Sequence, residues 1–595
     1  MRSLIAAMLL ATVASPALSQ GTTPQPQATA STPLQKVIDD HWRWWLSVNP
    51  VQATGLGVRD YDDRIDDLSL AARDARAKAE QGVLTRLEGI SDSGLDADAR
   101  TNKAVLSWML ADDIEANRHG ERMMLFTTYY GWQQGFADMA DNLPFYTRAD
   151  YESYLKRLSL FPVQNRQGID ITKQAVKESY IQPCSVLGGF ADTITATVAG
   201  KPEDTRFYAP FLRNRPRDIS QADWAAMQGR AVAMIRDVVT PEYARLHDYI
   251  AKDYVPHCRK TDGASALPDG AAWYATQVKA HTTTGLTPEQ IHAIGLSEVT
   301  RIRAGMDEVA KKAGYPSRAA FIEKLRTDPQ YYVKTPQELL QAAAFQAKMI
   351  DGLLPRYFGR LPRLPYGVRA IPPETAEGTT TAYYGPGAPE SGIAGHFYVN
   401  TSKLNQRPLW ELPALTAHEA VPGHHNQIAL QQELDLPQFR KHAASFTAYV
   451  EGWALYSEYL GEEMGLYDTP EKMMGRLSYE MWRACRLVVD TGIHAKGWTK
   501  AQAVTFMKEN SALTEANIDA EVNRYISWPG QALGYKLGEI RIRELRAKAE
   551  AALGPKFDLR AFHDAVLAEG PVPLDVLSGR IDAWIAAEKA KGAAS

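Results

Sequence analysis

The sequence predicts a mainly α-helical protein with one small β element, and three observations support this. Apolar residues recur at the helical period over long stretches rich in Ala, Arg, Glu and Lys. Pro and Gly are dense in residues 352–395, where a helical pattern fails. Residues 396–400 then combine aromatic and β-branched side chains, as short strands do. The composition, 45% apolar and 23% charged, is that of a globular protein.

Amphipathic helices are expected both before and after the Pro- and Gly-rich stretch. No fixed-period repeat divides the chain, so we expect a single helical domain over residues 34–595. The expected helices lie within 67–120 and over about 149–180, 219–254, 287–313, 318–327, 336–351, 410–432, 437–464, 470–495, 499–511, 515–526, 532–553 and 574–591.

The N-terminus has the layout of a secretory signal peptide over residues 1–19. Arg2 precedes a short apolar run, and small residues occupy the two positions that a signal peptidase reads. Cleavage between Ser19 and Gln20 would leave a polar, Pro-rich linker over 20–33, expected to be disordered, and a periplasmic or secreted protein. A buried N-terminal helix is the alternative. No cysteine follows the apolar run, which argues against a lipid anchor.

Charge and cysteine content exclude several classes of protein. The net charge is −4 with no basic stripe, so a nucleic-acid partner is not expected. No later apolar run is long enough for stable membrane insertion. The mature chain has three cysteines, too few for a disulfide scaffold: Cys184 and Cys258 can form one bridge, and Cys485 is expected to be a buried thiol. Nothing in the sequence specifies an oligomeric state.

The residues that carry chemistry gather in 416–425, which contain His418, Glu419, His424 and His425. A His-Glu pair followed by a second His one helical turn later is the zinc signature of metallopeptidases. Here proline occupies the position of that second His. The motif is therefore stretched, and it can bind a metal if the backbone between the histidines bends.

Pro422 and Gly423 can supply that bend. Pro422 cannot donate a hydrogen bond to the carbonyl of His418, and Gly423 tolerates almost any backbone angle. A bulge at this point would bring His424 to where a histidine four residues after His418 would lie. His425 is the alternative, because seven residues along a straight helix also return to roughly the same face.

A third ligand is expected from a later helix. Glu451 interrupts an apolar segment between Val450 and Trp453, where a carboxylate is costly to bury unless a metal or a partner compensates it. Glu458, seven residues on, lies on a similar face and is a candidate to support a ligand. A single histidine in such a pattern is usually a core residue, and a single glutamate in a helix usually faces solvent. Their combination favours metal binding.

The histidine motif and four other segments resemble the bacterial DUF885 family, over most of the mature chain. These segments are residues 394–401, 451–456, 490–494 and 529–538. The resemblance implies a zincin-like metallohydrolase related in architecture to carboxypeptidase Taq, thimet oligopeptidase and angiotensin-converting enzyme. It implies a large two-lobed helical metallopeptidase fold with a deep central cleft, lobes of roughly 34–350 and 351–595, and the β element beside the metal-binding helix. Those peptidases carry Gly directly before the second metal histidine, which favours His424 over His425.

The resulting hypothesis is an exported zinc-dependent hydrolase that cleaves peptide bonds of short peptides. His418, His424 and Glu451 would hold one Zn²⁺ per chain, and Glu419 would act as general base toward the attacking water. One rival is a metal-dependent hydrolase of non-peptide amides. Another is a non-catalytic binding protein with a vestigial metal site, against which the intact Glu419 argues.

Other residues are candidates for contacts with the reacting substrate. Tyr525, Tyr535 and His494 could stabilise an oxyanion, with a helix-packing tyrosine and an Asp–His cap as equal alternatives. Arg486 and Lys536 could hold a substrate carboxylate. The strand candidate could bind the substrate backbone as an added peptide strand.

Overall fold

The computed structural model describes residues 32–593 apart from 129, 378 and 390–391. The expected signal peptide and nearly all of the linker lie outside these residues. The described part is mainly helical, as predicted. Its helices before the sheet are α1 (Pro33–Val48), α2 (Pro50–Gly55), α3 (Leu70–Glu88), α4 (Ala97–Ala116), α5 (Trp132–Asn142), α6 (Arg148–Lys177), α7 (Phe190–Ala196), α8 (Gln221–Met234), α9 (Thr240–Tyr249), α10 (Gly270–Thr282), α11 (Pro288–Lys312), α12 (Arg318–Thr327) and α13 (Pro336–Asp351).

The second half begins with a small sheet and returns to helices. Its elements are β1 (Tyr366–Ala370), α14 (Pro373–Ala376), β2 (Ala382–Gly385), β3 (Gly395–Val399), α15 (Leu412–Glu419), α16 (His424–Glu433), α17 (Gln438–His442), α18 (Thr447–Leu460), α19 (Pro470–Lys496), α20 (Lys500–Asn510), α21 (Glu515–Ser527), α22 (Gly534–Leu553), α23 (Leu559–Leu567) and α24 (Leu574–Ala593). Among the described residues, no helix has the length and apolarity needed to cross a bilayer.

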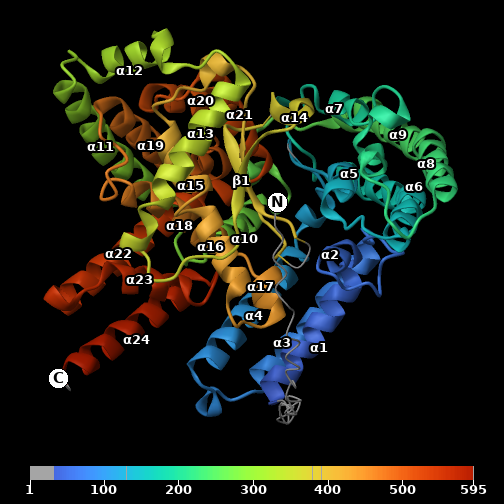
Figure 1. Ribbon diagram of the computed structural model, residues 1–595, viewed down its shortest axis with the longest axis horizontal. Coiled ribbons are helices and arrows are strands. Elements are labelled where there is room, and N and C mark those ends of the chain that lie inside the picture. The colour runs from blue at the N-terminus through green and yellow to red at the C-terminus, as the bar shows by residue number, and fades with distance from the viewer. Residues whose placement is uncertain (1–31, 129, 378, 390–391, 594–595) are drawn as a thin grey trace, which may run out of the picture.

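Two sets of helices lie on opposite sides of the molecule, and the second set begins earlier in the chain than expected (Figure 1). Helices α5 to α9 lie together on one side of the molecule, whereas α11, α12 and α13 lie with α19, α20 and α21 on the other (Figure 1). A buried cluster that includes Trp273, Ile291, Leu487 and Leu533 joins α10 and α11 to α19 and α22. The segment from α10 to α13 therefore packs with the C-terminal helices, in contrast to the expected division near residue 350.

The predicted strand is the central strand of a three-stranded sheet in the order β1-β3-β2. β1 pairs with β3 in parallel, with Val368 opposite Phe397, and β2 pairs with β3 antiparallel, with Ala382 opposite Val399. Both edges of β3 are thus occupied. The expectation that this strand accepts a peptide strand is wrong, because backbone groups of β1 and β2 already take its hydrogen bonds. The sheet packs against α13, α15 and α16, and so lies beside the histidine motif (Figure 1).

The cysteine predictions are confirmed. Cys184 and Cys258 form a disulfide, and Cys485 is a fully buried thiol in α19. The bridge joins the segment after α6 to the segment after α9, beside a backbone pairing of Pro183 with Arg259.

Candidate metal centre

Three side chains from two parts of the chain converge at the end of α15. His418 and His424 each present Nε2 to Glu451 Oε2, at 3.4 Å and 3.3 Å. All three candidate ligand atoms lie within 4.8 Å of one another. Tetrahedral zinc with ligands at about 2.0–2.2 Å separates its ligand atoms by about 3.3–3.6 Å. The measured separations from Glu451 therefore match an edge of that polyhedron.

The carboxylate of Glu451 lies between the two histidines without a hydrogen bond to one of its oxygens. Its Oε2 atom is buried and accepts no hydrogen bond from the described residues. Burial opposes ionisation of Glu451, yet the neighbouring His424 and His418 hold its pKa well below 4.5. One buried carboxylate oxygen and two imidazole nitrogens form a donor set that suits a divalent cation. The residues present therefore fit the implied zinc ion.

The backbone between the histidines breaks the helix rather than bulging within it. The helix predicted over 410–432 is two helices, because α15 ends at Glu419 and α16 begins at His424. Gly423 lies against the last turn of α15, where an added Cβ would be 1.9 Å from the carbonyl oxygen of His418. Trp453 Nε1 donates to the carbonyl of Pro422 at 2.8 Å, which fastens this turn to α18. The break re-aims His424 toward Glu451.

A close helix crossing brings α18 to α22. Gly452 and Gly538 meet there: a Cβ on Gly452 would be 2.6 Å from Gly538 Cα, and a Cβ on Gly538 would be 1.8 Å from the carbonyl oxygen of Ala448. Larger residues would force the helices apart. Glu451 on α18 and Tyr535 on α22 flank this crossing, so it sets their separation.

His418 is oriented by a second carboxylate. Its Nδ1 lies 2.8 Å from Oε1 of the buried Glu458, which Arg483 Nη2 contacts at 3.2 Å. Nδ1 therefore donates a hydrogen bond to Glu458, and the ring presents Nε2 to Glu451. Zinc-binding histidines are oriented by a carboxylate in the same way. Burial lowers the pKa of His418, but Glu451 and Glu458 together raise it to about 9. Glu458 supports the ligand as the sequence suggested, whereas Arg483 was not anticipated.

His425 points away from the three converging side chains. Its Nε2 donates to the carbonyl of Leu364 at 3.0 Å, and its Nδ1 lies 2.9 Å from the hydroxyl of Tyr384 on β2. Burial lowers the pKa of His425 to about 4, so the ring is neutral. Both nitrogens are used to tie α16 to the sheet. Of the two adjacent histidines, the geometry brings His424 to the centre.

Glu419 lies next to the centre without joining its ligand atoms. Its Oε2 is 4.0 Å from His424 Nε2, and its side chain retains some exposure to solvent. No other ion pair of this carboxylate is found among the described residues. The group is therefore placed to exchange a proton with a molecule bound beside His424.

The three candidates for oxyanion stabilisation differ in what their polar atoms contact. The ring of Tyr535 lies parallel to that of His418 with centroids 6.4 Å apart. Arg524 Nη2 donates to the hydroxyl of Tyr535 at 3.0 Å, so the phenolic hydrogen remains free to donate elsewhere. Tyr525 is buried and its oxygen already accepts from Trp482 and Arg486. Burial raises its pKa.

His494 is a structural residue. Its Nδ1 accepts from the backbone N–H of Ala264 at 2.9 Å, and its Nε2 donates to the carbonyl of Tyr525 at 2.9 Å. The ring is fully buried, and burial lowers its pKa to about 3. Both nitrogens are committed to backbone groups, so a role toward substrate, as considered from the sequence, does not fit this geometry.

Neither cation proposed for a substrate carboxylate is available to one. Lys536 has no exposed side-chain surface and contacts three carboxylates, those of Glu298, Glu480 and Glu539, at 2.8–3.0 Å. Arg486 is buried and pairs with Glu521 at 2.9 Å. Sequence alone did not show these acidic partners, which come from α11, α19, α21 and α22.

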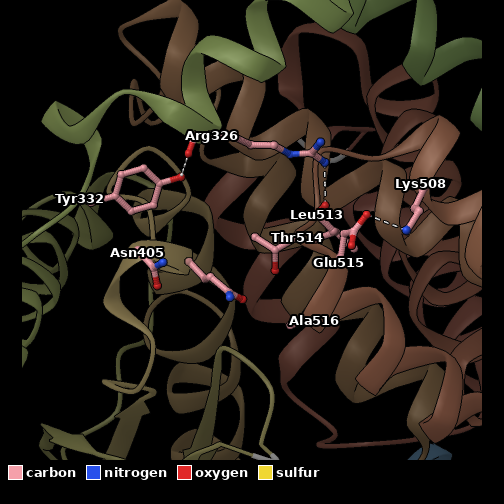
Figure 2. A pocket seen from close by; sticks show the side chains of 9 residues that line it. Arg326, Tyr332, Asn405, Lys508, Leu513, Thr514, Glu515 and Ala516 are labelled. Atoms are coloured by element: carbon pink, nitrogen blue, oxygen red, sulfur yellow. Dashed lines mark hydrogen bonds and ion pairs between the residues drawn. The ribbon is translucent and has the colours of Figure 1, made fainter.

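A cavity of about 370 Å³ lies away from these residues (Figure 2). Its charged groups already have partners: Lys508 pairs with Glu515 at 2.6 Å, and Arg326 donates to backbone carbonyls that include that of Leu513 at 2.6 Å. None of the converging ligands lines it. The predicted deep central cleft stays a prediction.

Comparison with known proteins shows the family and the fold. The chain is similar to a "putative lipoprotein" from Colwellia psychrerythraea, with TM-score 0.86 and 27% identity over 93% of this chain and 100% of that one. It also resembles a "putative lipoprotein of unknown function" from Shewanella oneidensis, with TM-score 0.66 and 19% identity over 92% and 99% of the two chains. Among curated proteins, none matches. The family model of a bacterial protein of unknown function, DUF885, matches residues 50–581. The chain, with its His418–His424–Glu451 centre, therefore belongs to the DUF885 family.

Proposed function

We propose that this protein is an exported zinc-dependent hydrolase that cleaves peptide bonds, mainly of short peptides. The observation that carries the proposal is the buried Oε2 of Glu451, which accepts no hydrogen bond from the described residues and lies 3.3–3.4 Å from two histidine nitrogens. Glu419 beside this group adds a proton acceptor. A relationship in architecture to the zincin peptidases is part of the proposal. Export is supported by the disulfide between Cys184 and Cys258, since such bonds persist in oxidising compartments.

Each residue of the proposed site has a separate role in metal binding, proton transfer or oxyanion stabilisation. His418, His424 and Glu451 would hold zinc, which when bound polarises a carbonyl group and lowers the pKa of water. Glu458 fixes the tautomer of His418, and Arg483 fixes Glu458. Glu419 would accept the proton of the attacking water and pass it to the leaving nitrogen. Tyr535 would donate its free hydroxyl hydrogen to the developing oxyanion.

Metal analysis and a hydrolysis assay test this function together. We expect the purified mature chain to hold close to one zinc per molecule, and the Glu451→Gln variant to lose it while keeping its helical circular dichroism. The control Glu509→Gln changes an exposed carboxylate of α20 and should keep the metal.

A peptide mixture and a set of acylated amino acids should be assayed with and without a chelator. Full zinc retention by Glu451→Gln contradicts the centre, and cleavage of the acylated amino acids alone favours the non-peptide alternative. Inertness toward both sets, with zinc bound, favours a binding protein.

Zinc affinity should rise with pH across the neutral range. The pKa of His418 is about 9 in the metal-free protein, so zinc must displace a proton from this ring at any lower pH. We expect the apparent Kd to fall by about tenfold for each pH unit between about 6.5 and 8.5. Competition with a chelator of known affinity measures this slope. Glu458→Gln removes one of the carboxylates that raise the pKa, so it should flatten the slope. An apparent Kd that is constant over this range contradicts the assignment of His418.

A further inference from the structure

Near the proposed metal centre, two arginine side chains face a single glutamate. Arg486 on α19 and Arg524 on α21 both face Glu521: Arg486 Nη2 lies 2.9 Å from Oε2, and Arg524 Nη1 lies 3.6 Å from Oε1. The other close groups around Arg486 are uncharged: the hydroxyl of Tyr525 and the rings of Trp482 and Tyr535. Two guanidinium groups thus share one carboxylate. An excess charge with little access to water is costly unless an anion compensates it.

Arg524 is the member of this pair that a ligand can reach. Its side chain is 16% exposed, against 2% for Arg486. Arg524 Nη2 donates to Gln531 Oε1 at 2.7 Å and to the hydroxyl of Tyr535 at 3.0 Å. The contact of Nη1 with Glu521 is too long for a hydrogen bond, and no described residue accepts one from Nε. The guanidinium therefore keeps donors for a carboxylate, the group that its planar fork fits best.

Tyr535 connects this guanidinium to the proposed metal centre. The aromatic ring of Tyr535 lies parallel to the ring of His418, and its hydroxyl contacts Arg524. The centroid of the Tyr535 ring lies 6.4 Å from that of His418 and 5.9 Å from the guanidinium carbon of Arg524. The cation therefore lies within about 12 Å of this metal ligand, a span that up to about four residues of extended peptide cover at ~3.3–3.6 Å each. Trp528, 42% exposed, lies 5.9 Å from the guanidinium and offers an apolar wall beside it.

We propose that Arg524 binds the terminal carboxylate of a peptide substrate that is cut within about four residues of its carboxyl end. This rests on the proposed function, because the cut is placed at the metal centre. The substrates would be short peptides with a free carboxyl end. An acidic side chain offers the same carboxylate chemistry, and the experiment must separate the two sources.

Three matched peptides separate these sources by activity. The first has a free carboxyl end, the second is its amide, and the third is an amide whose last residue is glutamate. We expect the wild-type kcat/KM for the free acid to exceed that for the amide by about 10- to 100-fold, mostly through KM, as for one charge-assisted hydrogen bond. Arg524→Gln should abolish this preference, and Arg524→Lys should keep part of it. Loss of the hydrogen bond to Tyr535 lowers kcat/KM for both peptides, so the ratio of the two values is the readout. Arg166→Gln, at an exposed position of α6, is the control and should keep it fully.

Binding measurements keep the inference testable without turnover. Calorimetry on zinc-loaded Glu419→Gln protein should show an acetylated dipeptide binding at least about tenfold more tightly than its amide, and the double variant with Arg524→Gln should bind both equally. Equal cleavage and equal binding of acid and amide by protein with wild-type Arg524 overturns the inference and leaves the proposed function standing. A preference for the glutamate amide over the free acid also overturns it. A persistent binding preference without chelator-sensitive cleavage overturns the hydrolase instead, and supports the carboxylate site.

Discussion

Replacing Glu419 by glutamine should abolish turnover and leave metal content unchanged. The carboxylate lies 4.0 Å from His424 Nε2, outside the set of ligand atoms that converge on Glu451, so its loss removes no metal ligand. The amide has nearly the same shape but cannot accept a proton from water. We expect kcat to fall by about 10²- to 10⁴-fold, the usual contribution of a general base. Stopped assays at saturating peptide, with zinc determined on the same samples, measure both quantities.

Two comparisons make this result specific. Glu509→Gln carries the same chemical change on the exposed face of α20 and should behave as the wild-type protein. If Glu419→Gln retains kcat within about threefold, Glu419 is not the base, since that change corresponds to well under 1 kcal/mol of barrier. Loss of zinc in this variant would make Glu419 a ligand rather than a base.

Helices were the most predictable part of this fold, because an amphipathic pattern is a local property of the sequence. The stretches expected over 287–313 and 336–351 correspond to α11 and α13. The sheet was less predictable. β1 and β2 have four or five residues each, and they are defined by pairing with β3 across a Pro- and Gly-rich stretch. Pairing between distant segments leaves little local signal, so one strand was expected where three form a sheet.

The candidate site also has residues that the sequence predicts and residues that it does not. His418, Glu419 and Glu451 were identifiable because a motif and a misplaced carboxylate are visible in the sequence itself. Arg483 and Arg524 were not, because their roles depend on neighbours from other helices. For the same reason the sequence suggested Lys536 and Arg486 as substrate contacts. A cation in a helical pattern does not reveal that carboxylates on other elements pair with it.

Replacing Gly423 by alanine should lower both zinc affinity and stability, because this residue lies in the turn that directs His424 toward Glu451. An added Cβ would lie 1.9 Å from the carbonyl oxygen of His418 and 2.5 Å from that of Ala417. Both are backbone atoms of the last turn of α15, so no side-chain rotation can relieve the contact. The turn must move, and His424 moves with it because it is the next residue. We expect at least about a 100-fold loss of zinc affinity, more than most changes to the groups that hydrogen-bond a ligand cause, together with ~1–3 kcal/mol of destabilisation from overpacking.

Gly229→Ala provides the matched control for this variant. Gly229 lies within α8, and a Cβ there would meet nothing within 4 Å, so alanine should be neutral or stabilise by about 0.5–1 kcal/mol through its better helix propensity. Competition with a chelator and thermal melts with and without zinc separate the two effects of Gly423→Ala. Lower stability with wild-type zinc affinity would mean that the turn can relax without moving His424. Zinc-dependent stabilisation should be lost if the position of His424 depends on the absence of a side chain at Gly423. Glu451 and His418 would then remain in place without a third ligand, and the defect would resemble that of His424→Ala although every ligand residue is present.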